Sequence, residues 1–123
     1  MTMSNKNTEQ KPKVTWQQLV VLLAQAVPAG AITTYAEVSD WAYGRRNLNQ
    51  PVSSLLRGAA NHGFTELTNR VVGTDGTSAS LPEGAAQQEA QLRAEGVPFL
   101  AVGQIDMVRA TVVQVSLETP MRV

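Results

Sequence analysis

The first regular pattern along the chain is a run of apolar residues at helical spacing. From Thr15 to residue 27, apolar side chains recur at intervals of three and four, which predicts a helix with a broad buried face. Thr15 and Gln18 have the spacing of a capping box, in which each side chain bonds the backbone of the other residue. The stretch Pro28-Ala29-Gly30 predicts the end of this helix.

A second helix is expected soon after the first. Residues 31–33 suit a short strand or an extended link. Thr34 and Glu37 repeat the capping-box spacing. The pattern therefore predicts a helix over residues 35–43, with Val38 and Ala42 turned inward.

A basic, turn-forming loop at residues 44–49 separates this helix from a third one. Pro51 suits the first turn of a helix, which we expect over residues 50–61. Its predicted core side consists of Val52, Leu55, Leu56 and Ala59. The order helix, link, helix, basic turn, helix is also that of helix-turn-helix proteins.

The second half of the chain predicts a strand, a turn and a fourth helix. Residues 70–72 suit a strand, and the Asp-Gly pair within residues 74–77 suits a tight turn. We expect a loop over residues 78–84 and a helix over residues 85–95, capped by Gly96. Its candidate inward residues are Ala86, Ala90 and Leu92.

Apolar residues alternate with others near the C-terminal end. The alternation predicts a small strand pair, suited to a wing, with a turn at residues 108–110. The candidate inward residues of this pair are Ile105, Met107, Thr111, Val113 and Val115.

The elements together predict a mostly α fold with a small β component. We interpret it as a winged helix-turn-helix-like domain of about four helices and a short C-terminal strand pair. At 123 residues the chain has room for one domain. We expect that domain at residues 14–117, between a disordered tail at residues 1–13 and a C-terminal tail at residues 118–123.

Composition excludes several classes of function. No apolar run approaches the roughly 20 residues that cross a bilayer, so we expect no membrane association. Residues 1–13 lack the pattern of an export or transit signal, which predicts a cytoplasmic protein. The chain has no cysteine and a single histidine, His62, so we expect no disulfide, no thiolate nucleophile and no metal site.

The charge is unevenly distributed along the chain. The net charge is zero, but residues 41–70 carry a local charge of +3 and residues 71–123 a charge of −3. The basic stretch owes its sign to four arginines, Arg45, Arg46, Arg57 and Arg70. Such a stretch is either an ordinary solvated surface or a contact surface for a polyanion, and charge alone does not decide between the two.

Three segments resemble one known family. Residues 27–38 (VPAGAITTYAEV) are similar to its "P-x-G-x-V-T-T-Y-G-x-I/V" motif, and residues 69–76 (NRVVGTDG) to the end of "P-C-H-R-V-V-G-x-D-G". Residues 81–84 (LPEG), Gln87 and residues 92–97 (LRAEGV) are similar to "L-P-x-G … Q … L-x-A-E-G-V". The chain thus resembles the DNA-binding domain of the alkylguanine-DNA alkyltransferases, the methylated-DNA cysteine methyltransferase family, and most of all their alkyltransferase-like branch.

The resemblance implies a DNA-binding surface. Family members place the second helix of the helix-turn-helix in the minor groove and flip a nucleotide out of the duplex. A groove about 6 Å wide admits a helix only if the contact face is slim. The DNA-binding residues implied here are Thr34, Tyr35, Arg46, Gln50, Pro51, Ser53, Ser54 and Arg57.

The resemblance also implies that alkyl transfer is lost. Thr68 aligns with the acceptor cysteine and Asn69 with its histidine partner, so neither a thiolate nor its base is present. Glu95 aligns with the relay glutamate, and we expect it to keep only a structural role. We therefore expect a protein that is not an enzyme and uses no cofactor.

A lesion pocket is implied behind the Thr68 segment, with Tyr35, Thr68, Asn69, Arg70 and Ser78 as its residues. The alkyltransferase-like branch fills the gap left by the flipped base with an arginine. Gln50 stands at that position here, unless the alignment slips across residues 47–49, in which case Arg46 would intercalate.

The sequence therefore favours a non-enzymatic protein that recognises alkylated guanine in double-stranded DNA by nucleotide flipping. Its partners would be duplex DNA and other DNA repair proteins. Two alternatives stay open: a winged-helix-like DNA-binding regulator or accessory protein without lesion specificity, and a protein-interaction adaptor that has lost DNA binding.

Overall fold

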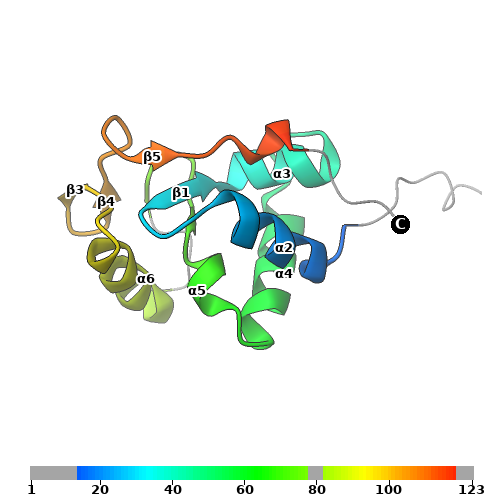
Figure 1. Ribbon diagram of the computed structural model, residues 1–123, viewed down its shortest axis with the longest axis horizontal. Coiled ribbons are helices and arrows are strands. Elements are labelled where there is room, and N and C mark those ends of the chain that lie inside the picture. The colour runs from blue at the N-terminus through cyan, green and yellow to red at the C-terminus, as the bar shows by residue number, and fades with distance from the viewer. Residues whose placement is uncertain (1–13, 78–81, 119–123) are drawn as a thin grey trace, which may run out of the picture.

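The computed structural model describes residues 14–77 and 82–118. Figure 1 shows α6 and the β3–β4 pair at one end of the molecule, α2, α3 and α4 at the other, and β1 between them. The elements are α2 (Trp16–Ala26), β1 (Ala31–Thr34), α3 (Tyr35–Tyr43), α4 (Asn49–Asn61), α5 (Thr65–Thr68), β2 (Val71–Val72), α6 (Pro82–Ala94), β3 (Phe99–Ala101), β4 (Gln104–Ile105), β5 (Thr111–Val112) and the 3₁₀ helix η2 (Val115–Leu117). The predicted fold class, mostly α with a small β component around a helix-turn-helix, is confirmed. The predicted tails, Glu118 excepted, lie outside the described residues.

A small parallel sheet divides the hydrophobic core in two. β1 lies between β2 and β5 and pairs with both in parallel. Successive residues of a strand face opposite sides of a sheet. Accordingly, Ala31 and Val71 pack with the helices α2, α3 and α4, whereas Ile32 and Val72 pack with α6 and the segment that follows it.

The predicted helix starts are largely confirmed. Thr15 and Gln18 form the complete capping box at the start of α2. At α3 only half of the predicted box is present. The Thr34 hydroxyl accepts the backbone N–H of Glu37 at 3.2 Å, but the Glu37 carboxylate turns away and accepts the backbone N–H of Ser116 at 2.9 Å.

The helix α6 differs from the predicted helix in its first residue and in which of its side chains are buried. It begins at Pro82, so the predicted loop ends three residues early. Ala86 and Ala90, expected to face inward, are exposed, while Gln88 and Leu92 are buried. Gln88 belongs to the inner face because its amide donates to the carbonyls of Asn69 and Val71, at 2.9 and 3.1 Å. The spacing of apolar residues does not predict that a polar side chain such as Gln88 is buried.

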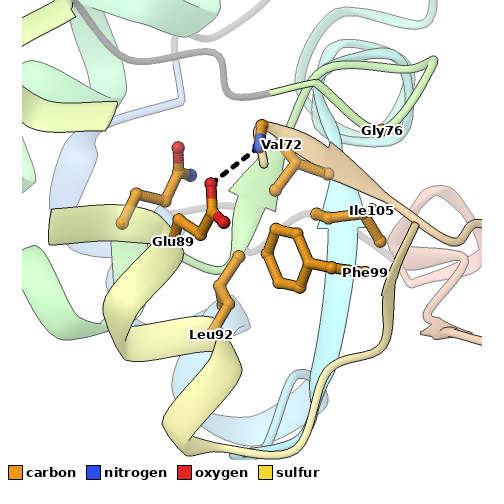
Figure 2. A pocket seen from close by; sticks show the side chains of 8 residues that line it. Val72, Gly76, Glu89, Leu92, Phe99 and Ile105 are labelled. Carbon is orange, nitrogen blue, oxygen red and sulfur yellow. Dashed lines mark hydrogen bonds between the residues drawn. The ribbon is translucent and has the colours of Figure 1, made fainter. Parts of the chain in front are cut away.

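The second core is small and tightly filled. Leu92 of α6 meets Val72, Phe99 and Ile105, and Glu89 accepts the backbone N–H of Gly103 at 2.8 Å across the same gap (Figure 2). The cavity left among these side chains measures about 10 Å³, which is room for about one water molecule. This end of the molecule is therefore a packed core rather than a ligand pocket.

The predicted C-terminal strand pair is wrong in its pairing. Ile105 pairs with Phe99 in the antiparallel β3–β4 ladder, and Thr111 pairs in parallel with Ala31 of β1. Val115 is buried in η2 rather than in a strand. An alternating pattern predicts that every second residue of a strand faces the core, but it does not specify which strand pairs with it.

The Asp-Gly turn after β2 and the cap of α6 are confirmed. Gly76 has φ +89°, and a Cβ there would lie 2.7 Å from Met107, so only glycine fits. Gly96 follows the end of α6, where the N–H of Val97 bonds the carbonyl of Leu92 at 2.9 Å.

A buried ion pair joins the ends of three elements. The Arg70 guanidinium donates to both carboxylate oxygens of Glu95, at 3.0 and 2.8 Å, and to the Val27 carbonyl at 3.3 Å. It thereby ties the end of α2 and the start of β2 to the end of α6. The hydrogen bond from Arg70 lowers the pKa of Glu95. The structural role predicted for Glu95 is confirmed.

We predict that Glu95→Gln lowers the free energy of unfolding by about 3 kcal/mol at pH 7, because it leaves the buried guanidinium of Arg70 with only the exposed carboxylate of Glu66 as a counter-charge. A lowered carboxyl pKa contributes stability that is complete above the ordinary value of 4.5 and is lost as pH falls through the folded value. The difference between variant and wild type should therefore shrink in acid, as measured by urea unfolding at pH 7 and pH 3.

Glu66→Gln is the matched control, because Glu66 is 75% exposed and lies 3.7 Å from the same guanidinium. It should cost no more than about 1 kcal/mol. Equal losses for the two variants would show that the Arg70–Glu95 pair does not hold the three elements together.

Candidate nucleic-acid interface

An open hollow of about 590 Å³ lies where β1 and β2 end, lined by Tyr35, Asn49, Gly73, Thr74 and Asp75. Its position follows from the sheet. The two strands run in parallel with Thr34 opposite Val72, so the residues that follow each strand emerge at the same edge. Such an edge is a frequent place for ligands in parallel sheets. The first turn of α4 supplies the third wall through Asn49.

Tyr35 links this hollow to the face of α4. It is the first residue of α3 and is half-buried, and its phenol oxygen lies 3.3 Å from the Ser53 hydroxyl. Thr34, which precedes it, is buried and caps the helix with its hydroxyl. Of these two predicted DNA-binding residues, Tyr35 lines the hollow and Thr34 holds the helix start in place.

The helix α4 presents a slim outer face. Val52, Leu56 and Ala59 are buried, and the opposite side carries small or polar side chains. The exposed predicted residues on it are Gln50, Pro51, Ser54 and Arg57, with Ser53 half-buried beside Tyr35. Arg57 makes no ion pair with any residue in the described ranges. The predicted helix residues therefore lie on one surface, with a free cation on its last part.

Arg46 in the turn before α4 is engaged by acids of α3. Its guanidinium lies 3.2 Å from Glu37 and 3.4 Å from Asp40. Burial pushes the pKa of Glu37 upward, but hydrogen bonds from Ser116 and Arg46 outweigh it, so the pKa is lowered and the carboxylate stays charged. The alternative prediction that Arg46 swings into the duplex would require this ion pair to break.

Three residues predicted to line the lesion pocket, Thr68, Asn69 and Arg70, bond to other parts of the chain and are absent from the lining of the hollow. The Thr68 hydroxyl donates to the Thr65 carbonyl at 3.2 Å, and the Asn69 amide donates to Gln91 at 2.9 Å. Arg70 is held by Glu95. Ser78 lies outside the described residues. Among the described members of the predicted lesion pocket, Tyr35 alone lines the hollow.

The sequence reasoning missed the remaining walls of the hollow. The sequence predicts a turn at residues 74–77 and a loop that includes Asn49, and it gives Gly73 only as part of the family-like segment 69–76. The signal that could have found them is the pairing of β1 with β2, which brings both strand ends together. Asp75 adds a negative charge here, and hydrogen bonds from the Thr77 hydroxyl and N–H lower the pKa of its carboxyl.

Within residues 14–77 and 82–118, no group of three or more His, Cys, Asp or Glu side chains is arranged to hold a metal ion. No helix in these ranges combines the length and apolar character needed to cross a membrane.

Comparison with known proteins places these features in a family. No protein-family model matches the chain. The DNA base-flipping proteins of Escherichia coli K12 and Shigella flexneri are each 34% identical to it over 98 residues, which is 80% of this chain and 70% of each relative. The crystal structure of Schizosaccharomyces pombe Atl1 bound to damaged DNA containing O6-carboxymethylguanine superimposes with a TM-score of 0.62 at 17% identity, over 78% of this chain and 92% of Atl1. The chain belongs to the alkyltransferase-like family, the family of the DNA base-flipping proteins.

Proposed function

We propose that the protein is a non-enzymatic DNA-binding protein that recognises alkylated guanine in duplex DNA by minor-groove binding and nucleotide flipping. The observation that carries the proposal is the hollow edged by Tyr35 directly beside the slim face of α4. Related proteins are named for DNA base flipping, and the Atl1 structure contains damaged DNA.

In this proposal α4 lies along the minor groove. Pro51, Ser53 and Ser54 keep the contact face thin enough for a narrow groove. Arg57, exposed and free of acids among the described residues, would contact phosphate. These contacts position the protein on DNA without reading the sequence.

The hollow would receive the flipped nucleotide. Asp75 on its wall is negatively charged, which disfavours phosphate and suits the amino groups of a base edge. Tyr35 stands at the rim, where it would press on the backbone as the nucleotide rotates. An alkylated and weakly paired guanine costs up to a few kcal/mol less to extrude than a normal base, so flipping itself discriminates.

Gln50 would fill the gap left in the duplex. It is exposed in the first turn of α4, next to Asn49 at the wall of the hollow. Arg46 is a poorer candidate because Glu37 and Asp40 already bind its guanidinium. Thr34 would serve the site indirectly by capping the helix that carries Tyr35.

Alkyl transfer has no support among the residues that replace the reactive pair. The chain contains no cysteine. The Thr68 hydroxyl donates to a backbone carbonyl, and its neighbour Asn69 has no basic group that could take a proton. We propose that Thr68, Asn69 and Arg70 shape the segment behind the hollow rather than react. A repair function without chemistry of its own would pass the lesion to other repair proteins in the cytoplasm.

The direct test compares affinity for two duplexes that differ by one O6-methylguanine. We predict that wild-type protein binds the lesion duplex about tenfold or more tightly in fluorescence anisotropy, because roughly 1.4 kcal/mol of easier extrusion is a factor of ten. Equal affinity would rule out lesion recognition and leave a general DNA-binding protein. Absence of binding to either duplex at low salt would instead favour a protein-interaction adaptor.

Two substitutions separate flipping from general binding. Tyr35→Ala should weaken binding to the lesion duplex and leave the unmodified duplex nearly unchanged, because the ring acts only when a nucleotide leaves the stack. Arg57→Ala should weaken binding to both duplexes by the same factor and lower the salt-dependence slope by about 0.9. If Tyr35→Ala costs nothing on the lesion duplex, the flipping part of the proposal fails.

A further inference from the structure

The two neighbouring arginines of the turn before α4 have different surroundings. Arg46 is bound to Glu37 and Asp40, at 3.2 and 3.4 Å, so two acids compensate its charge. Arg45 is exposed and makes no ion pair with any residue that the structure describes. Adjacent in sequence, the two side chains therefore offer very different attraction to an anion.

The Ser39 side chain holds the backbone of this turn in place through two hydrogen bonds. This side chain is completely buried in α3, and its hydroxyl donates to the backbone carbonyl of Arg45 while accepting the N–H of Leu48 at 3.0 Å. One hydroxyl thus satisfies two backbone groups on opposite sides of the turn. Gly44 opens the turn with φ +74°, where the chain leaves α3.

The turn held by Ser39 is followed directly by the candidate interface. Leu48 is followed by Asn49, which begins α4 and lines the hollow. Because its backbone is already held at this point, Arg45 would lose only side-chain freedom, and no backbone freedom, on meeting a phosphate of a duplex seated on α4. Arg46 is less suited, since the carboxylates around it would repel the same phosphate.

We propose that Arg45 is the phosphate-contacting cation of this turn and that Ser39 is the positioning residue that holds it there. This inference rests on the proposed DNA-binding function. It adds to that function a phosphate contact by Arg45 and the residue that positions the turn carrying it, Ser39. The contact carries no sequence or lesion information, so it should matter equally for damaged and undamaged duplexes.

The test of Arg45 measures affinity for both duplexes across a range of salt concentrations. Arg45→Ala should weaken binding to both duplexes by the same factor and reduce the log-log salt slope by about 0.9, the value of one phosphate contact. Arg109→Ala is the matched control, because it removes another exposed charge, from the turn that follows β4, and should leave the slope unchanged. Arg46→Ala should also change the slope by much less than 0.9.

A double-mutant cycle tests Ser39. Ser39→Ala should reduce affinity and slope in the wild-type background but add nothing in the Arg45→Ala background, because it acts through Arg45. Thr15→Ala, which removes the capping box of α2, controls for a general loss of stability and should not show this dependence. If Ser39→Ala fails to fold, Ser39→Cys keeps the size and a weaker donor, and the same dependence is expected of it.

The outcomes separate this inference from the proposed function. If wild-type protein binds neither duplex, the DNA-binding function itself is wrong. If it binds and Arg45→Ala behaves like Arg109→Ala, or Arg46→Ala gives the larger slope change, the assignment of Arg45 is wrong. If Ser39→Ala lowers affinity by the same factor with and without Arg45, Ser39 supports only the general fold.

Discussion

The parallel pairing of β1 with β2 arranges both the core and the candidate site. With Thr34 opposite Val72, alternate residues of the two strands face two separate apolar clusters. The same register makes Tyr35 and residues 73–75 emerge side by side at one edge of the sheet. Arg70, just before β2, anchors this arrangement to the end of α6 through Glu95. The hollow is thus a consequence of the strand register.

Acidic side chains around the helix-turn-helix form ion pairs with some of its arginines and not with others. The guanidinium of Arg70 is buried against Glu95, and that of Arg46, in the turn before α4, pairs with Glu37 and Asp40 of α3. Among the four arginines of the basic stretch, Arg45 and Arg57 remain without an ion pair in the described parts of the chain. The local charge of +3 therefore overstates the cationic surface, which reduces to Arg45 in the turn before α4 and Arg57 on the slim face of that helix.

Local patterns could predict the helices but not the contacts between distant segments. The capping box of Thr15 and Gln18, the Asp-Gly turn and the cap at Gly96 depend on neighbouring residues and are confirmed. The pairing of Thr111 with Ala31 joins residues far apart in the chain, and no local pattern specifies it. For the same reason the sequence predicts only part of the candidate site. Tyr35 followed from the family resemblance, whereas the rest of the hollow depends on strand register.

The central claim is that a nucleotide leaves the duplex when the protein binds. The most direct measurement places 2-aminopurine next to O6-methylguanine, because this fluorescent base is quenched while stacked and brightens when its neighbour is extruded. Our account predicts a rise in fluorescence with wild-type protein and little or no rise with Tyr35→Ala at matched occupancy. Full binding by anisotropy without any change in fluorescence would show that the lesion stays in the stack and would contradict the account.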